Sequence, residues 1–335
     1  MPRVSVIMPV FNAADYLMAA LESIAAQTYD DWELVAVDDG STDASPDILA
    51  KCDDARIRVV RQENAGVSAA LNTGLQHAQG ELIARLDADD IAAPHRLAVQ
   101  VEFLDRHPKI DGVGSWVRYI DGAGRPLSGG IRRATTPLAV QRALVLGSPL
   151  SHPTVLLRRL FFDRHGAYLV GARHVEDYDL WVRAGREARL ANLPWPLVDY
   201  RVHDTAVGVT ASDEQRRNAA QVARRALDIL PRRDSLFRRW LAGRQGGRWL
   251  RDESRAWPRE TTREATDLDF ITLGTAGAKA LVSRRWRLAV EIACETAGFA
   301  TVRPGAVWRF AVRHLWRLRR YYREAAGARL PRETT

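Results

Sequence analysis

The stretch "VSVIMPVFNAADYLMAALESIAAQTYDDWELVAVDD", residues 4–39, decides the fold. It begins and ends with short runs of apolar and β-branched residues, 4–10 and 32–38, which are typical of buried strands. Between these runs, apolar residues recur at spacings of three and four and predict a helix with one buried face. These residues are Leu17, Ala20, Leu21 and Ile24. The stretch therefore predicts a strand–helix–strand unit of a parallel sheet.

The same alternation of strand and helix patterns continues beyond this unit. Further strands are predicted at 57–61 and 81–87, and further helices at 45–52, 67–78 and 94–107. Ser45 before Pro46 is typical of an N-cap followed by proline in the first helical turn. We therefore expect an α/β fold with a mainly parallel, Rossmann-like sheet flanked by helices on both faces.

The composition is that of a soluble globular protein, with 46% hydrophobic and 27% charged residues among 335. Only Cys52 and Cys294 are present, so a disulfide framework is not expected. The amino terminus lacks a signal-peptide cleavage pattern, and no run of about 18 apolar residues occurs. We expect a cytoplasmic protein that can also lie at the inner face of the cytoplasmic membrane.

The net charge of +8 is unevenly distributed along the chain. Residues 1–210 carry 22 Lys and Arg against 27 Asp and Glu, whereas 211–335 carry 27 against 14. The two parts thus have net charges of −5 and +13. This change predicts a catalytic domain over 1–210 and a basic, mostly helical region over 211–335.

Acidic and small polar residues follow the predicted strands, where ligands collect in open α/β sheets. "DDGSTD" (38–43) follows the second strand and "DADD" (87–90) the fourth. Taken alone, 38–43 could be a simple turn with an N-cap. Paired aspartates at two strand ends, however, repel each other unless a cation lies between them. Carboxylate oxygens suit Mg²⁺ or Mn²⁺, which leave positions for phosphate oxygens.

Two common nucleotide-binding motifs are missing. No "GxxxxGK[ST]" loop occurs, which argues against an ATPase, and no "GxGxxG" follows the first strand, which argues against a dinucleotide-binding dehydrogenase. A divalent metal would instead neutralise charge on a departing diphosphate. The sequence therefore favours an enzyme whose leaving group is a nucleoside diphosphate.

Seven segments in order resemble the inverting family 2 glycosyltransferases of the bacterial surface-polysaccharide type, which have the GT-A fold. They are "MPVFNAADYL", "VAVDDGSTD", "ENAGVSAALNTG", "ARLDADD", "SHPTVLLR", "VEDYDLWVR" and "YRVHDTAVG". The resemblance implies transfer of a hexosyl or N-acetylhexosaminyl group from a nucleotide diphosphate sugar to an acceptor hydroxyl, with inversion. UDP-sugars are the expected donors, and a glycan or lipid-linked molecule is the expected acceptor.

The resemblance also assigns donor-binding residues. Those for the nucleoside side are Pro9, Phe11, Asn12, Asp38, Asp39, Asn64 and Gly66. Asp87 is expected at the ribose and Asp89 at the metal, while Asp90 could join them or hydrogen-bond amides ahead of the helix near Pro94. Near the end of the last motif, His203 is a candidate for the metal or diphosphate and Arg201 for the diphosphate or a carboxylate. A purely structural histidine is the alternative for His203.

The general base is expected in "VEDYDLW", because the acceptor hydroxyl must lose its proton in the transition state. The resemblance assigns this role to Asp177, with Glu176 beside it and Trp181 as a wall for the acceptor. The alternative is an acidic first helical turn that interacts with the helix dipole. His152 is expected to border the acceptor pocket, with a simple turn as the alternative.

One position departs from the family pattern. Many members have arginine where this chain has Leu71, so a cationic partner for the donor is missing there. Arg85, directly before the acidic motif, could supply the positive charge instead.

Beyond residue 210 the sequence predicts helices at 213–230, 278–297 and 307–326. The last has an apolar face bordered by arginines and contains Trp308 and Trp316. Such a helix suits an anionic membrane surface, so 306–324 is a candidate membrane contact, with packing on the catalytic domain as the alternative.

Two other classes of protein share some of these features. A metal-dependent nucleotidyltransferase would usually have a Gly-rich, basic loop after the first strand, and "PVFNAADY" is not one. A nucleic-acid-binding protein could use the basic region, but its acidic motifs would be unexplained and would repel phosphates. We therefore expect no nucleic acid partner.

Overall fold

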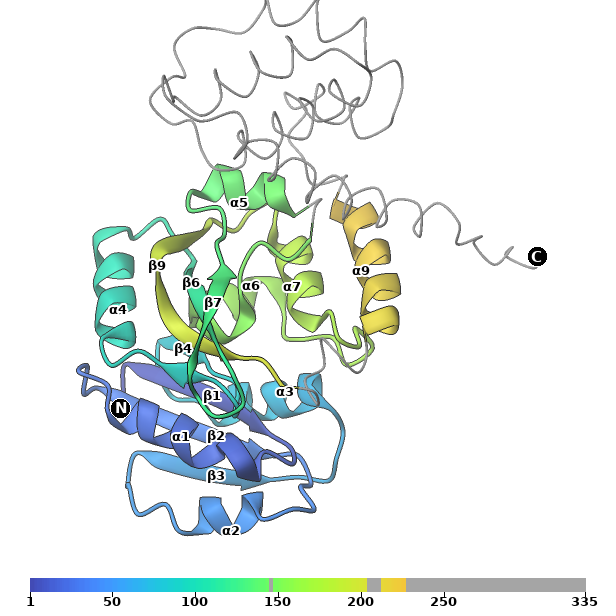
Figure 1. Cartoon of the computed structure of the whole chain (residues 1–335). Coiled ribbons are helices and arrows are strands. Elements are labelled where there is room, and N and C mark those ends of the chain that lie inside the picture. Colours follow the sequence, from blue (N-terminus) through green and yellow to red (C-terminus); the bar gives the residue numbers. More distant parts are fainter. Residues whose placement is uncertain (145–146, 204–211, 227–335) are drawn as a thin grey trace, which may run out of the picture. The chain divides into compact units, whose positions relative to one another are not determined.

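The computed structural model describes residues 1–144, 147–203 and 212–226 (Figure 1). Its core is a sheet of nine strands in the order β3-β2-β1-β4-β8-β6-β9-β5, with β7 paired to β6. The strands are β1 (Val4–Val10), β2 (Trp32–Asp38), β3 (Ile57–Arg61), β4 (Leu82–Arg85), β5 (Ile91–Ala92), β6 (Gly112–Ile120), β7 (Pro126–Ile131), β8 (Leu156–Arg158) and β9 (Leu190–Arg201).

Helices connect the strands. They are α1 (Ala14–Ala25), α2 (Ser45–Ala50), α3 (Val67–His77), α4 (Arg96–Arg106), α5 (Pro137–Ala143), the short 3₁₀ helix η1 (His152–Thr154), α6 (Arg159–His165), α7 (Glu176–Ala184) and α9 (Ser212–Ala226).

The amino-terminal half of the sheet confirms the predicted alternation. β1 pairs in parallel with β2 and β4, and β2 pairs in parallel with β3. The expected apolar face of α1 is buried, because Leu17, Ala20, Leu21 and Ile24 are at most 3% exposed. The predicted strands and helices of this half lie within two residues of the observed bounds.

Helices cover both faces of this parallel half (Figure 1). Alternate residues of β1 pack with the apolar faces of α1 and α4 in one large core. On the opposite face α3 approaches so closely that a Cβ on Gly74 would lie 2.4 Å from Ile7 Cγ2. A glycine is therefore needed where α3 crosses β1.

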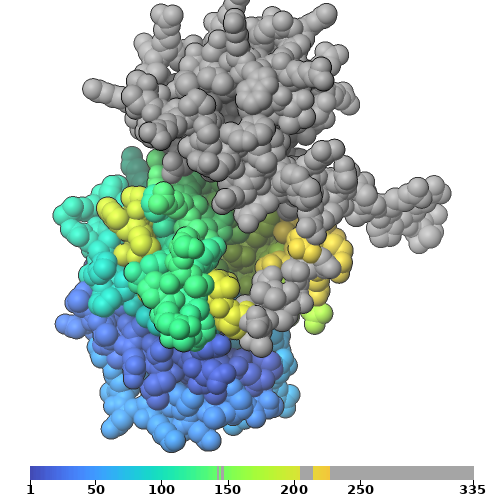
Figure 2. All heavy atoms as spheres, in the orientation of Figure 1, coloured from blue at the N-terminus to red at the C-terminus, as the bar shows by residue number. Residues whose placement is uncertain are grey.

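The other half of the sheet has strands that the sequence analysis did not predict. β8 runs antiparallel to both β4 and β6, while β6 pairs in parallel with the long β9. β7 is an exposed edge strand, and the green atoms of this region lie on the surface in Figure 2. The sheet is therefore mixed, with its parallel part at the amino-terminal side.

The predicted N-cap at Ser45 is wrong. Ser45 is the first residue of α2, and its Oγ accepts a hydrogen bond from the Ala13 amide at the start of α1. Asp43 acts at both helix starts instead: Oδ1 accepts from the Ser45 amide and Oδ2 from the Ala14 amide, each at 2.9 Å. One carboxylate thus satisfies exposed donors of two helices.

The predicted domain boundary at residue 210 lies in the undescribed segment 204–211, so this division stays a prediction. The described part of the predicted helix 213–230 falls in α9. The predicted helices at 278–297 and 307–326, with the membrane contact at 306–324, lie outside the described residues. In the described part of the chain, no helix combines the length and apolar character needed to cross a membrane.

Candidate active site

Three carboxylates gather where the chain leaves β4. Asp87, Asp89 and Asp90 each offer one oxygen atom, and these atoms lie within 4.8 Å of one another. β4 ends at Arg85, and β5 begins directly after Asp90, so a short loop between two strands holds all three. Hard oxygen ligands at this spacing suit a divalent cation.

Asp87 is paired with a neighbouring cation. Arg85 Nη1 donates to Asp87 Oδ2 at 2.8 Å, and Arg85 Nη2 donates to the other oxygen. Arg85 is only 6% exposed, so this bidentate pair fixes the Asp87 carboxylate. Leu71, which stands where many family members have arginine, is buried on α3. The donor contact predicted for Arg85 stays a prediction.

Asp89 lies beside the end of β9. Its Oδ2 is 2.9 Å from His203 Nε2, although the two residues are 114 positions apart. The ring of Tyr16 packs against His203, with centroids 4.9 Å apart. The two residues predicted to bind metal therefore touch in the structure.

Arg201 is occupied by the protein itself. Its Nε donates to the Asp89 carbonyl at 2.7 Å, and its Nη1 donates to the carbonyls of Asp121 and Gly122, both at 3.0 Å. The guanidinium also lies 4.7 Å from the centre of the Tyr16 ring. These contacts hold the Asp89 loop against β9, and diphosphate binding by Arg201 stays a prediction.

Asp90 does not cap the helix after Pro94, so that interpretation is wrong. Its Oδ1 accepts from the Arg201 amide at 2.8 Å, and α4 begins with no side-chain cap. Burial and then the charges of Asp87 and Asp89 raise the pKa of Asp90 well above its ordinary value. A nearby cation would favour the charged form of this carboxyl.

The residues predicted for the nucleoside pocket lie at the ends of β1 and β2. Phe11 is half exposed, and Pro9 is the last but one residue of β1. Asn12 has a left-handed φ of 50°, and its Oδ1 accepts from the Thr42 amide at 2.8 Å. Asp38 Oδ1 accepts from the Ser41 amide at 2.9 Å. The two strand ends are thus tied to one another.

Asp39 organises the loop before α3. Its two oxygens accept from Gln62 Nε2 at 2.7 Å and from the Ala65 and Gly66 amides at 2.9 Å. Gly66 has a φ of +88°, a conformation that favours glycine. Asn64 is exposed in the same loop. Asp39 therefore has a structural role here, and its contact with a nucleobase stays a prediction.

Asp177 and Glu176 open α7. Ser148 Oγ donates to Asp177 Oδ2 at 2.8 Å, whereas Glu176 Oε2 is buried with no hydrogen bond among the described residues. Burial raises the pKa of Asp177, and the Ser148 hydrogen bond only partly offsets it. Burial and the charge of Asp177 raise the pKa of Glu176 to about 7. Asp177 is the more exposed of the two.

His152 lies close to Glu176. Its Nε2 is 3.0 Å from the Tyr168 hydroxyl and its Nδ1 is 3.8 Å from Glu176 Oε1. Burial and then the charge of Arg85 lower the pKa of His152 well below its ordinary value. The imidazole is therefore neutral near pH 7, and its contact with Glu176 is not an ion pair.

Trp181 does not fit its predicted place in the acceptor pocket. The side chain is fully buried and packs against His152 and Phe161, with ring centroids 6.1 and 6.0 Å apart. An acceptor sugar could not reach it without rearrangement of α7. Trp181 fixes the helix that carries the two acidic residues.

The acidic motif and the start of α7 affect one another electrostatically. The negative charge of Asp177 contributes to raising the pKa of Asp87, and the positive charge of Arg85 contributes to lowering the pKa of both Glu176 and Asp177. Charges influence one another in this way only over short distances through the protein. The acidic motif and the start of α7 therefore lie near enough for their charges to interact.

Sequence reasoning missed several residues of this region. Ser148 and Tyr168 contact the candidate residues directly, and Arg133 Nε lies 3.5 Å from Ser151 Oγ. The negative charge of Asp177 also acts on Arg133, whose pKa is lowered by burial. They lie in connecting segments without a strand or helix pattern, so only the fold identifies them.

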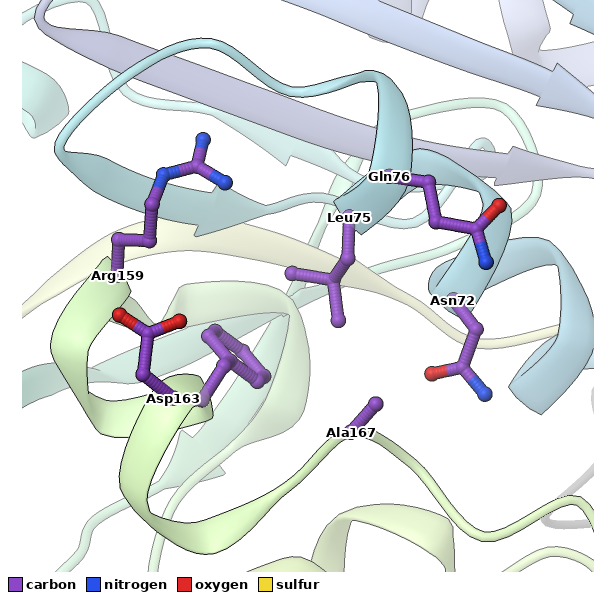
Figure 3. Close-up of a pocket in the computed structure, with 7 residues that line it drawn as sticks. Asn72, Leu75, Gln76, Arg159, Asp163 and Ala167 are labelled. Atoms are coloured by element: carbon purple, nitrogen blue, oxygen red, sulfur yellow. The ribbon is translucent and has the colours of Figure 1, made fainter.

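A surface hollow of about 310 Å³ lies elsewhere, between α3 and α6 (Figure 3). Its lining residues are Asn72, Leu75, Gln76, Arg159, Phe162, Asp163 and Ala167. None of the candidate site residues lines it. We therefore assign the hollow no role in the reaction.

Solved structures share this fold. S. aureus TarS residues 1–349, in complex with UDP-GlcNAc, is similar with a TM-score of 0.56 and 20% identity over 97% of this chain and 92% of that one. The mannosyltransferase PcManGT from Pyrobaculum calidifontis, in complex with GDP-Man and Mn²⁺, gives a TM-score of 0.54 and 20% identity over 97% and 86%. The expected GT-A fold is confirmed.

Relatives found by sequence are more similar to this chain in amino-acid identity than these structures are. An uncharacterized glycosyltransferase of Haemophilus influenzae is 30% identical over 234 residues, 67% of this chain and 72% of that protein. The putative glycosyltransferase EpsE of Bacillus subtilis is 35% identical over 190 residues, 54% of this chain and 66% of that protein. The model of glycosyl transferase family 2 matches residues 5–164. The nucleotidyltransferase and nucleic-acid-binding alternatives are not favoured, and the chain belongs to glycosyl transferase family 2.

Proposed function

We propose that this protein moves a sugar from a nucleoside diphosphate sugar to an acceptor hydroxyl with inversion at the anomeric carbon, and that a divalent metal ion assists. One observation carries the proposal: three carboxylates form a cluster, and Asp177 on α7 is near enough for its charge to raise the pKa of Asp87. The TarS and PcManGT complexes, with UDP-GlcNAc and with GDP-Man and Mn²⁺, support it.

The residues present fit a divalent metal. Three carboxylate oxygens within 4.8 Å of one another repel each other, and the buried Asp90 Oδ2 has no hydrogen-bond partner among the described residues. Asp89 and His203, which touch at 2.9 Å, would hold the ion, while Arg85 neutralises Asp87. When bound, Mn²⁺ or Mg²⁺ supplies positive charge to the departing diphosphate.

The donor is proposed to be a UDP-sugar with a hexosyl or N-acetylhexosaminyl group. Its nucleoside would lie at the ends of β1 and β2, between Asn12 and Asp39. The loops there are held by hydrogen bonds from Thr42 to Asn12 and from Gly66 to Asp39. Such preformed loops reduce the entropy lost on binding.

Asp177 is proposed as the general base. It is more exposed than Glu176, and its hydrogen bond from Ser148 holds one of its oxygens in place. Its raised pKa brings a carboxylate closer to the pH at which a base works best. Glu176 is buried beside the neutral His152, so an acceptor hydroxyl would reach it less easily than Asp177.

The acceptor is proposed to be a glycan or lipid-linked molecule in bacterial polysaccharide or glycolipid synthesis. Family membership supports this assignment. His152, buried beside Glu176, would help shape the acceptor side of the site. Work at the inner face of the cytoplasmic membrane, with contact through 306–324, is part of the same proposal.

The test incubates the protein with UDP-, GDP- and dTDP-sugars and Mn²⁺, and measures the released nucleoside diphosphate. We expect one donor to be consumed, with loss of activity in chelator and a decrease of about 10²–10⁴-fold in Asp177→Asn. NMR of the product reports the anomeric configuration. Folded protein that consumes no donor contradicts the proposal, and a retained configuration contradicts its inverting part.

A further inference from the structure

We propose that Arg96 and Gln100 on α4 are positioning residues that hold the donor and acceptor halves of the site in register. The inference rests on the proposed function. Neither side chain is exposed: both have 0% relative accessibility, although both are strongly polar. They lie over the junction where β4, β8 and β6 join the parallel half and the mixed half of the sheet.

Arg96 links the acidic motif to the segment that carries His152. Its Nη2 donates to the Arg85 carbonyl at 2.7 Å and to the Val155 carbonyl at 3.3 Å. Arg85 is the residue that pairs with Asp87, and Val155 directly follows η1. A shift of either segment would break one of these hydrogen bonds.

Gln100 extends the link to a third strand. Arg96 Nε donates to Gln100 Oε1 at 3.1 Å, and Gln100 Nε2 donates to the carbonyls of Val113 at 3.2 Å and Thr154 at 2.7 Å. Thr154 in turn accepts from the Ser115 amide at 2.9 Å. One helix face therefore ties β4, η1 and β6 together.

The charge of Arg96 matters as well as its hydrogen bonds. Its interaction with Asp90 is the main favourable contribution to the charged form of Arg96, against a burial cost that lowers its pKa to about 9. Asp90 Oδ1 holds the Arg201 amide, and Arg201 Nε holds the Asp89 carbonyl. Without Arg96, the loop that carries the candidate metal ligand would lose a nearby positive charge.

The energetics argue against a role in packing alone. A fully buried guanidinium is costly, and replacing buried charged groups with apolar side chains of similar volume is often neutral or stabilising. Arg96 and Gln100 together hold four backbone carbonyls of three separate segments at fixed positions, and apolar side chains could not do this. We therefore expect substitution to affect the site more than overall stability.

The experiment compares Mn²⁺ affinity by electron paramagnetic resonance in wild type, Arg96→Met, Arg96→Lys and Gln100→Met. Arg159→Met is the matched control, because Arg159 also donates to two backbone carbonyls, of Gly80 at 2.7 Å and Ala78 at 2.8 Å. That arginine lines the hollow of Figure 3, which none of the candidate site residues lines. Melting temperature and donor kinetics are measured for every variant.

We expect Arg96→Met to weaken Mn²⁺ binding by about 10–100-fold, the usual effect of removing a group that orients metal ligands. Arg96→Lys should recover part of the affinity through its charge, and Gln100→Met should lower kcat more than it raises KM. Arg159→Met should reduce the melting temperature without changing Mn²⁺ affinity.

Equal Mn²⁺ affinities and kcat values in wild type, Arg96→Met and Gln100→Met would overturn the inference. If Arg96→Met fails to fold, Gln100→Met, which keeps the Arg96 guanidinium, decides the question alone. Absence of Mn²⁺ binding in the wild type would instead contradict the metal-dependent function itself, and the inference with it.

Discussion

At the scale of single residues, Asp177 and Glu176 are adjacent carboxyls in different surroundings. Asp177 is partly exposed and hydrogen-bonded to Ser148, while Glu176 is buried beside His152. Burial and then the negative charge of Asp177 raise the pKa of Glu176, whereas burial is what raises the pKa of Asp177. The two residues should therefore differ in how they affect the rate.

The pH profile of sugar transfer separates them. A base works deprotonated, and burial raises the pKa of Asp177, so the rate should rise with pH through a value above the ordinary carboxyl pKa. Asp177→Asn should remove most of the activity and, with it, this rise of the rate with pH. Glu176→Gln leaves the proposed base and its hydrogen bond from Ser148 in place, so it should keep both the activity and the rise of the rate with pH.

Rates measured from pH 4 to about 9 with a fixed donor check this assignment. A rise of the rate with pH reports the pKa of the essential base of the enzyme. If Glu176→Gln were inactive and Asp177→Asn active, Glu176 would be the base and the assignment to Asp177 would be contradicted. Ser148→Ala provides a control that removes a hydrogen bond from Asp177 and leaves both carboxyls.

Individual residues also show what a sequence can reveal. Asp89 and His203 meet although 114 positions separate them, and both were predicted because each belongs to a recognisable motif. Arg96, Ser148 and Tyr168 were not predicted as site residues, since a single arginine, serine or tyrosine has no pattern. Their roles depend on contacts that exist only in the folded chain.

At the scale of elements, the parallel half of the sheet could be predicted and the mixed half could not. Each element from β1 to α4 has its own periodicity and flanking turn residues. β8 has only three residues, β7 contains proline and two glycines, and β6 begins with glycines at its first and third positions. Such strands are specified by neighbours in the sheet rather than by local preference.

The paired starts of α1 and α2 allow a test at this scale. Asp43 accepts from the amides of Ala14 and Ser45, so Asp43→Ala should lower the unfolding free energy by about 1–2 kcal/mol, as for lost N-caps. Burial opposes the shift, but these hydrogen bonds lower the pKa of Asp43. Its contribution should therefore be present above the ordinary carboxyl pKa and decrease as pH falls through the lowered value.

Urea unfolding of wild type and Asp43→Ala at neutral and acidic pH gives both quantities. Asp47→Ala, an exposed aspartate on α2 without a hydrogen bond to a helix start among the described contacts, is the matched control. A loss of stability no larger than that of the control would contradict the double cap.

At the scale of the whole molecule, charge explains why a metal should be required. Residues 1–210 have a net charge of −5, and three of their carboxylates meet at the proposed donor site. A nucleoside diphosphate sugar is itself an anion, so it would be repelled from this region without a cation. Metal and donor should consequently bind together.

Calorimetric titration of a UDP-sugar into the protein, with Mn²⁺ or with chelator, tests this central claim most directly. We predict binding that requires Mn²⁺ and is weakened at least about tenfold in Asp89→Ala, as expected for a lost metal ligand. The control Asp47→Ala should bind like the wild type. Donor binding of equal strength in chelator, or in Asp89→Ala, would contradict the account.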